Sequence, residues 1–401
     1  MNKTVQNNDK SAARLITSAA FVSILIYSMV VSIPGVLINE VVETFSLSGT
    51  DEGLMGAVTS LGFLLSMIFV IMIQGRARKT IVLTAAFVAQ AIVLFFCGIS
   101  PTFLIFCSFC TLIGFSGGFI DTFTNSSVVD IQKNESTKSL GFLHGLFGLG
   151  SLLSPLIFVW LLRFVDWRGV HYLLAIASML VAILVFSLTG RLGKNSNETV
   201  VVKEHLFTKT DLFAYLRVKR NVVLALSGFF AMFAIAAVLV WIVRYMTIQY
   251  DAAELGALSI SVYWICSTIN RFLFVHFIKR SPMMFFSLGA VLSGICIIIG
   301  VFSGNPVILC IMMGLFGIFS GHFIPVLISE CAAGYEGRTT FTTSFIMFVM
   351  CIARVISPII MAFTSTTFSL TAGMMIPVVA ALATACCGLL SLKQGVSIKH
   401  E

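Results

Sequence analysis

Charge is scarce in this sequence. Asp, Glu, Lys and Arg together make up 10% of the 401 residues, whereas hydrophobic residues make up 58%, and the mean hydropathy is +1.03. A soluble domain could not cover its surface with so few charged side chains, so the composition excludes one and indicates an integral membrane protein. The apolar runs do not alternate polar with apolar residues, which argues against a transmembrane β-barrel.

The chemistry of an enzyme is also missing from the sequence. There is no nucleophile elbow, no cluster of metal ligands and no sizeable soluble domain, and the basic loop from Gly75 to Lys79 lacks the pattern of a phosphate-binding Walker loop. The ten cysteines lie in or beside apolar runs, and Cys107 and Cys110 indicate packing, not a disulfide or a metal site. We therefore expect no enzymatic activity, no metal and no cofactor.

Long apolar runs are what the sequence does contain. A helix needs about 20 apolar residues to cross a bilayer. The first run is too long for a signal peptide and lacks a cleavage site, so it counts as a span. Twelve runs qualify: 14–38, 53–74, 80–99, 103–128, 140–162, 170–190, 222–246, 253–277, 283–302, 306–329, 340–363 and 368–392.

One polar stretch divides these runs into two groups of six. It covers residues 191–221 and separates an N-terminal block, 1–190, from a C-terminal block, 222–401. This layout is typical of secondary transporters with two bundles, in which the substrate binds near the membrane midplane between the halves. The sequence predicts an all-α integral membrane fold of two six-helix bundles joined by a cytoplasmic linker.

The net charge of +8 predicts orientation, not nucleic-acid binding. Most of the 25 Lys and Arg residues fall in the tails and in alternate loops, for example at Arg76, Arg78 and Lys79, whereas the opposite loops carry acids such as Glu40 and Asp166. By the positive-inside rule, both termini lie in the cytoplasm. We expect a multi-pass protein of the bacterial cytoplasmic (inner) membrane, whose partners are the lipid bilayer and a small-molecule substrate, with no nucleic acid.

Asp121 is the most informative residue because it lies inside an apolar run. Placing a charge at this depth costs at least a few kcal/mol, so an intramembrane acid is a candidate ion or substrate site. Asn125 follows four residues later on the same helical face, and a carboxylate beside an amide can bind sugar hydroxyls. His144 enters the next span at a comparable depth. Asp121 and His144 are predicted proton-coupling groups, or else they form a structural hydrogen bond between helices.

The second half contains two intramembrane arginines and a histidine. Arg354 lies near the middle of its span, where a cation must pair or face water, and it is a candidate counter-ion for Asp121 or a fork for an anionic substrate. Arg271 is a candidate for the same two roles, although a latch to loops or helix ends is its favoured interpretation. His322 is either a mirror of the fourth-span site or a packing residue. The other predicted substrate ligands are Tyr27, Trp264, Asn270 and Asn125.

Glycine is concentrated in the fourth, fifth and tenth spans. Small residues let helices approach closely in lipid, so Gly118 and Gly148 favour either sliding helix contacts or ordinary membrane packing. Together with Arg76, Arg78 and Arg271, they are the predicted structural or gating residues.

Several motifs resemble the major facilitator superfamily, and within it the fucose–proton symporter group and the sodium-dependent glucose transporter type. They are Asp121 with Asn125, the stretch 143–150 followed by Ser154-Pro155, Trp241 to Tyr245, Arg271-Phe272 and Ile324-Pro325. The resemblance implies a sugar importer working by alternating access, with Asp121 as the proton or substrate carboxyl and Asn125 as a sugar ligand.

The sequence also departs from the fucose symporter. That protein has a second acid in its first span, whereas residues 14–38 contain none here. It has Gly near the position of Arg354, which favours a negatively charged substrate for this chain, and Gln in place of His144.

These observations favour uptake of a monosaccharide or a related polar metabolite by a monomer, coupled to H⁺ in preference to Na⁺. Three alternatives remain open. The 37 Phe residues are compatible with a greasy cavity for proton-antiport efflux of amphipathic compounds. Arg354 is compatible with uptake of an anionic sugar or organic acid. A membrane receptor that does not transport is the third.

Overall fold

The computed structural model describes residues 3–47, 49–132, 135–195, 204–277 and 281–394, and every regular element in them is a helix. The chain forms two compact units. Unit 1 contains residues 1–136, 149–207 and 336–344, and unit 2 contains residues 137–148, 208–335 and 345–401. These units divide at 207–208, inside the predicted linker. Two short segments are exceptions, since residues 137–148 belong to unit 2 and residues 336–344 belong to unit 1.

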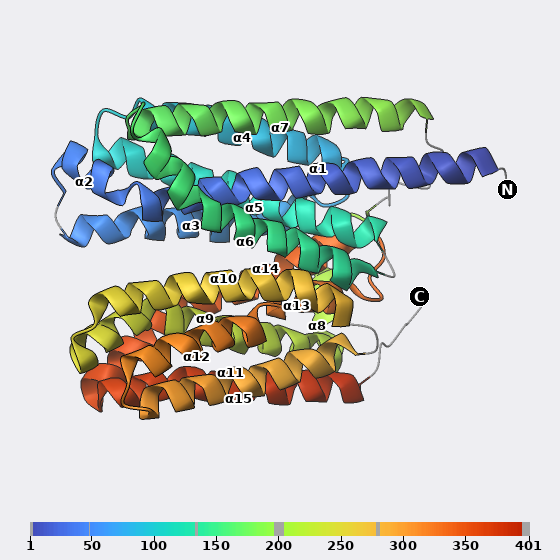
Figure 1. The fold of residues 1–401 in the computed structure, drawn as a ribbon. Coiled ribbons are helices and arrows are strands. Elements are labelled where there is room, and N and C mark those ends of the chain that lie inside the picture. The colour runs from blue at the N-terminus through green and yellow to red at the C-terminus, as the bar shows by residue number, and fades with distance from the viewer. Residues whose placement is uncertain (1–2, 48, 133–134, 196–203, 278–280, 395–401) are drawn as a thin grey trace. The chain divides into compact units, whose positions relative to one another are not determined.

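Unit 1 is built around one central helix, α5 (Phe103–Ile131), which packs against α1, α3 and α4 (Figure 1). Most positions of α5 from Phe106 to Val129 are buried, so it has little surface to offer lipid. The helix begins at Thr102, whose hydroxyl accepts a hydrogen bond from the Ile105 N–H and caps the first turn. The other helices are α1 (Lys3–Val36), α2 (Ile38–Phe45), α3 (Gly49–Ile73), α4 (Lys79–Gly98), the second part of α6 (Ser136–Leu161) and α7 (Trp167–Asn195).

Glycines bring α3 and α5 into backbone contact. A Cβ on Gly62 would overlap the carbonyl oxygen of Thr111, and a Cβ on Gly114 would overlap that of Thr59. The two contacts are reciprocal, since each helix presents one glycine to the other. Gly118 continues this interface, because a side chain there would overlap the Ser66 hydroxyl. Close packing of small residues is the usual way to hold helices together in lipid.

Unit 2 contains a similar arrangement of long helices. α10 packs on α9 and α12, while α11 packs on α12 and α15 (Figure 1). Arg220 at the start of α9 pairs with Glu330 of α13, at 2.5 Å between Nη2 and Oε2. The helices are α8 (Lys209–Arg217), α9 (Lys219–Tyr250), α10 (Ala253–Phe277), α11 (Pro282–Phe302), α12 (Pro306–Ser320), α13 (Phe323–Ala332), α14 (Thr339–Thr367) and α15 (Leu370–Lys393).

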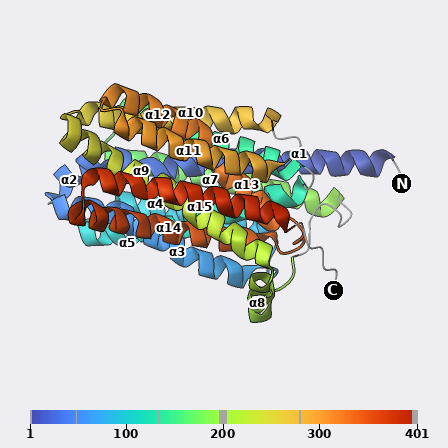
Figure 2. The same cartoon turned by 90° about the horizontal axis from the view of Figure 1, so that it is seen from below.

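The predicted linker is partly helical. α8 occupies Lys209–Arg217, and the backbone at Val218 is extended before α9 begins at Lys219. Figure 2 shows α8 as a short separate helix set at an angle to α9. Tyr215 anchors it, because its ring packs 4.9 Å from that of Tyr335, and burial raises the pKa of its hydroxyl well above the ordinary value. Residues 196–203 of the linker lie outside the described residues, as do residues 1–2 and 395–401 of the two predicted cytoplasmic tails.

Each of the twelve predicted spans corresponds to helix, so the predicted fold class is confirmed. By length and composition, ten helices of the described chain qualify as membrane spans, and Ala57–Ile73 of α3 is a shorter apolar helix. The predicted run 306–329 is one of these spans, Pro306–Ala332. Within it, α12 ends at Ser320 and α13 begins at Phe323.

Candidate functional site

Asp121 and Asn125 form a hydrogen-bonded pair on α5. The Asn125 amide nitrogen donates to the Asp121 carboxylate at 2.7 Å and to the Asp121 backbone carbonyl at 2.9 Å. One helical turn separates the two residues, so the pair needs no other helix to assemble it. Asn125 is fully buried, whereas Asp121 is only partly buried. The amide of Asn125 therefore orients the carboxyl group of a residue that is not fully enclosed.

The Asn125 amide oxygen takes no part in these two hydrogen bonds. It is buried, and no hydrogen-bond donor reaches it from the described residues. Both N–H bonds are already used on Asp121, so what this amide can offer a ligand is an acceptor. An acceptor next to a carboxylate suits a solute with several hydroxyl donors. A buried acceptor without a partner costs roughly 1–3 kcal/mol, which binding of such a solute would recover.

Tyr27 lies against the same helix. Its side chain on α1 is 4% exposed, and a Cβ on Gly117 would come within 2.7 Å of the Tyr27 ring. Glycine at position 117 thus makes room for the aromatic ring beside α5. The structure brings Tyr27, Asp121 and Asn125 into one unit, as the set of predicted ligands in the first half requires.

In unit 2 the polar groups gather on one face of α10. Tyr263, Ser267 and Arg271 are buried at spacings of four residues, while Ile265, Ile269 and Leu273 are exposed. This pattern is the inverse of a soluble amphipathic helix and is typical of a membrane helix whose polar face turns inward. The polar face of α10 is therefore the second candidate site.

Arg271 is bound by backbone carbonyls. Its side chain is 4% exposed; Nε donates to the carbonyl of Gly321 at 2.9 Å, and Nη1 donates to that of His144 at 3.1 Å. The guanidinium also lies 5.9 Å from the centre of the Trp264 ring. Arg271, for which a latch to helix ends is the favoured interpretation from the sequence, does contact a helix end, at Gly321. It also lies close to Trp264, one of the predicted ligands.

The break between α12 and α13 explains the first of these hydrogen bonds. Pro325 has no N–H, so the carbonyl of Gly321, four residues earlier, cannot receive its helical hydrogen bond. The regular pattern resumes with Val326 donating to His322 at 3.2 Å. Arg271 supplies the missing donor at Gly321. A discontinuous helix whose free carbonyl meets a buried cation is a common element of transporter binding sites.

His144 and Gly148 lie on the part of α6 that belongs to unit 2. His144 is 6% exposed, and its Nε2 atom has no partner among the described residues. A Cβ on Gly148 would overlap the Thr268 hydroxyl and would lie 3.3 Å from Arg271 Nη1. Hence α6 and α10 are in contact at Gly148 and Thr268, next to Arg271. Asp121 belongs to the other unit, so the predicted coupling of Asp121 with His144 stays a prediction.

The remaining predicted ligands lie at different places in unit 2. His322 is buried and turned toward α11, with Nε2 3.3 Å from the carbonyl oxygen of Phe285. Arg354 is exposed on α14. Trp264 and Asn270 are half-buried on α10, and the Asn270 amide oxygen has no partner in the described part of the chain. Of these four, the structure brings Trp264 and Asn270 to the polar face of α10.

The basic loop after α3 leads to a further charged cluster in unit 1. Lys79 Nζ lies 2.8 Å from Asp130 Oδ2 and 3.0 Å from Glu204 Oε1, and it donates to the Thr339 hydroxyl at 2.7 Å. Glu204 also accepts the Thr340 N–H at 2.8 Å, which caps the first turn of α14. We call Lys79, Asp130, Glu204 and Thr339 the Lys79 cluster.

Sequence analysis assigned gating to Arg76 and Arg78, and both are exposed. Their neighbour Lys79 makes the ion pairs. Gly75 is also engaged, because its φ of +72° is a left-handed value and a Cβ there would come within 2.8 Å of the His205 backbone. Glu204 gave no signal in the sequence, since it lies in a polar stretch with no periodic pattern.

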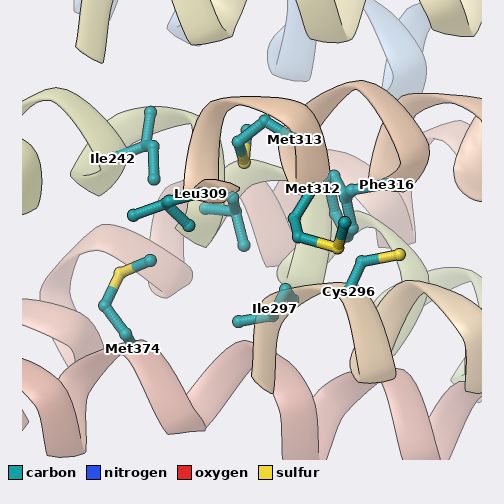
Figure 3. Close-up of a pocket in the computed structure, with 9 residues that line it drawn as sticks. Ile242, Cys296, Ile297, Leu309, Met312, Met313, Phe316 and Met374 are labelled. Atoms are coloured by element: carbon teal, nitrogen blue, oxygen red, sulfur yellow. The ribbon is translucent and has the colours of Figure 1, made fainter. Parts of the chain in front are cut away.

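Unit 2 also contains a small apolar pocket, which leaves no room for a water molecule (Figure 3). It offers no hydroxyl, amide or carboxylate to a polar solute. Its residues are Val238, Ile242, Cys296, Ile297, Leu309, Met312, Met313, Phe316 and Met374. The pocket is therefore a gap in helix packing and not a candidate site for a polar substrate.

The helical fold, the apolar spans and the polar faces within them define a membrane transporter. A family model described as Major Facilitator Superfamily matches residues 20–358. The chain belongs to this superfamily and is a multi-pass secondary transporter of a small molecule, not an enzyme.

Solved structures share this fold. A variant of the E. coli fucose:proton symporter has a TM-score of 0.76 at 15% identity, covering 94% of this chain and 98% of its own. The same symporter in the outward conformation has a TM-score of 0.76 at 14% identity, covering 95% and 99%. The human organic anion transporter MFSD10 has a TM-score of 0.72 at 13% identity, covering 94% and 99%. No curated protein matches the chain.

Proposed function

We propose that this chain is a proton-coupled importer of a monosaccharide or a related polar metabolite, working by alternating access. The observation that carries the proposal is the Asp121–Asn125 pair, in which a partly exposed carboxyl group lies in a span and is oriented by an amide. Asp121 binds and releases the proton. The unused Asn125 oxygen accepts a hydrogen bond from a solute hydroxyl. The fold shared with a fucose:proton symporter supports the same assignment.

The choice of a proton over a sodium ion follows from the donor set. A sodium site needs several oxygen ligands converging on one point, whereas a single carboxyl group with one amide neighbour is sufficient to carry a proton. The residue types beside Asp121 on α5 are those of a hydrogen-bonding site, with Asn125 already committed to the carboxylate.

The proposal includes orientation and oligomeric state. The excess of Lys and Arg in the tails and alternate loops supports cytoplasmic termini in a bacterial inner membrane, and we propose that the protein works as a monomer. Reporter fusions at the C-terminus, green fluorescent protein against alkaline phosphatase, test the orientation. A fusion active only as phosphatase would reverse it.

The experiment is uptake by purified protein in proteoliposomes with an alkaline interior. We expect labelled monosaccharides such as fucose, glucose and galactose to accumulate, and a protonophore to abolish this accumulation. Uptake driven only by a sodium gradient would overturn the coupling ion. Proton-driven extrusion of an amphipathic dye, with no sugar uptake, would replace the proposal with efflux. No flux of any solute would indicate a receptor.

A further inference from the structure

Arg271 has no acidic partner among the described residues of its unit. No carboxylate of the described residues forms an ion pair with it, and both of its hydrogen bonds go to neutral carbonyls. A buried cation without an anionic partner is strongly unfavourable, by several kcal/mol after relaxation. Carbonyl dipoles offset part of this cost but leave the unit charge uncompensated.

Two residues that lie against Arg271 have unused polar atoms. His144 Nε2 and the Thr268 hydroxyl are buried and have no partner in the described chain. Both belong to residues that lie against Arg271, because His144 offers Arg271 its own carbonyl and Gly148 touches Thr268 and Arg271 together. The second terminal nitrogen of Arg271, Nη2, likewise has no acceptor among the described residues. Arg271 Nη2 and two further potential donors thus have no acceptor among the described residues.

We propose that Arg271 and His144 form the binding site for a carboxylate group of the transported solute. One oxygen of the carboxylate accepts from Arg271 Nη2, and the other accepts from His144 Nε2 in the tautomer that carries a proton there. The Thr268 hydroxyl lies beside them as a third donor. This inference rests on the proposed function only in that the solute is transported.

Charge and shape both select a carboxylate. The site has a single fixed positive charge, which one carboxylate neutralises, whereas a doubly charged phosphate would leave a negative charge in place. A halide is spherical and cannot use a donor fork as a flat group with two oxygens does. The same chemistry distinguishes an acidic sugar from its neutral parent, since the two differ by one carboxylate.

Trp264 provides a direct signal for the test. Its ring lies 5.9 Å from the Arg271 guanidinium, and the chain has only four tryptophans. We would titrate the full-length protein in lipid nanodiscs with glucuronate and with glucose, following tryptophan emission. The expected result is an emission change with glucuronate and an affinity roughly 30-fold or more above that for glucose, as for a buried charged hydrogen bond.

Two variants separate binding from folding. Arg271→Gln removes the charge, and we expect glucuronate affinity to fall to that of glucose. Because Arg271 also holds the Gly321 carbonyl, this variant can fail to fold, so a second one is needed. His144→Leu keeps the backbone carbonyl that Arg271 uses and removes only the ring nitrogen. It should weaken glucuronate binding by roughly 3- to 10-fold and weaken glucose binding by less. Arg244→Gln, which removes an exposed arginine from the same unit, is the matched control.

The outcomes also separate this inference from the proposed function. Equal affinity for glucuronate and glucose in the wild type, or equal losses for both in His144→Leu, would overturn the carboxylate site. Chloride or phosphate competing as well as glucuronate would overturn it too. Proton-driven glucose uptake without glucuronate binding would reject the inference alone. Glucuronate binding dependent on Arg271 without proton-driven uptake would reject the proposed function and leave the site standing.

Discussion

The helix pair α3 and α5 in unit 1 and the pair α10 and α12 in unit 2 are built alike but carry opposite charges. In both pairs, glycine lets one backbone reach the other: Gly62 meets the Thr111 carbonyl, and Gly317 meets the Tyr263 carbonyl. The first pair carries Asp121, which its own helix orients through Asn125. The second carries Arg271, which is bound by carbonyls from outside its own helix.

The difference separates two tasks. A carboxyl group can exist in a neutral and a charged form, whereas a guanidinium stays charged. Unit 1 therefore holds the group proposed to carry the proton, and unit 2 holds the fixed charge proposed to bind a solute. The close helix packing is common to both units, so function is set by which ionisable residue is placed on it.

The largest effect is expected from Asp121→Asn. This substitution keeps the hydrogen bond with Asn125 possible but removes the proton-carrying group, so accumulation against a gradient should disappear while solute exchange across the membrane continues. Proteoliposome uptake driven by a pH gradient, compared with counterflow, measures the two activities separately. Asp251→Asn is the control, since Asp251 is exposed and asparagine tolerates its left-handed φ of 52°. Normal gradient-driven uptake by Asp121→Asn would reject Asp121 as the coupling group.

Equal losses of stability are expected from Gly62→Ala and Gly317→Ala. In both, the new methyl group meets a backbone carbonyl that cannot move aside, so each should cost about 1–3 kcal/mol. Thermal unfolding of the purified variants is the measurement. Gly294→Ala is the control, because its Cβ would make an ordinary 3.5 Å contact with Ala381. A loss confined to one variant would show that the two helix pairs are not equivalent.

A local effect is expected from Glu204→Gln. The substitution removes the ion pair with Lys79 and weakens the acceptor for the Thr340 N–H. Hydrogen exchange at the start of α14 should accelerate roughly 5- to 30-fold, with the rest of the chain unaffected. Glu254→Gln, at an exposed position in the first turn of α10, serves for comparison. Unchanged exchange at Thr340 would mean that Glu204 does not stabilise this helix end.

The smallest effect is expected from Arg354→Ala. This arginine is exposed, whereas Arg271 is buried. A charge interaction is weaker at an exposed position, so a loss of only a few-fold in glucuronate uptake is expected. Glucose uptake should not change. A larger effect than that of Arg271→Gln would exchange the roles assigned to the two arginines, and an equal effect on glucose would indicate a structural role for Arg354.

Local features could be predicted from the sequence. The spans follow from hydropathy, and the Asp121–Asn125 pair follows from a spacing of four residues, because both depend on neighbouring positions in one helix. The break after Ser320 left a signal in Pro325, which removes a specific hydrogen bond. A run of apolar residues continues across it, and this concealed the interruption.

Contacts between distant segments could not be predicted. Arg271 and Gly321 are 50 positions apart, and Glu204 and Thr340 are 136 apart, and no periodic pattern links such residues. Arg76 and Arg78 are predicted from the sequence as structural or gating residues because they lie in a basic loop between two spans. Only the folded chain shows that their neighbour Lys79 forms ion pairs with Asp130 and Glu204. Tertiary pairing of single charges requires coordinates.

The Gly321 carbonyl receives no helical hydrogen bond because Pro325 has no N–H. It links the shape of the α12–α13 helix to anion binding at Arg271. The guanidinium of Arg271 stabilises the interrupted α12–α13 backbone only while Nε remains on that oxygen. Any anion that draws the guanidinium away raises the energy of the interruption, and straightening or bending the helix in turn changes the affinity for the anion by the same factor. This reciprocity is thermodynamic linkage, and here a single side chain is sufficient to transmit it.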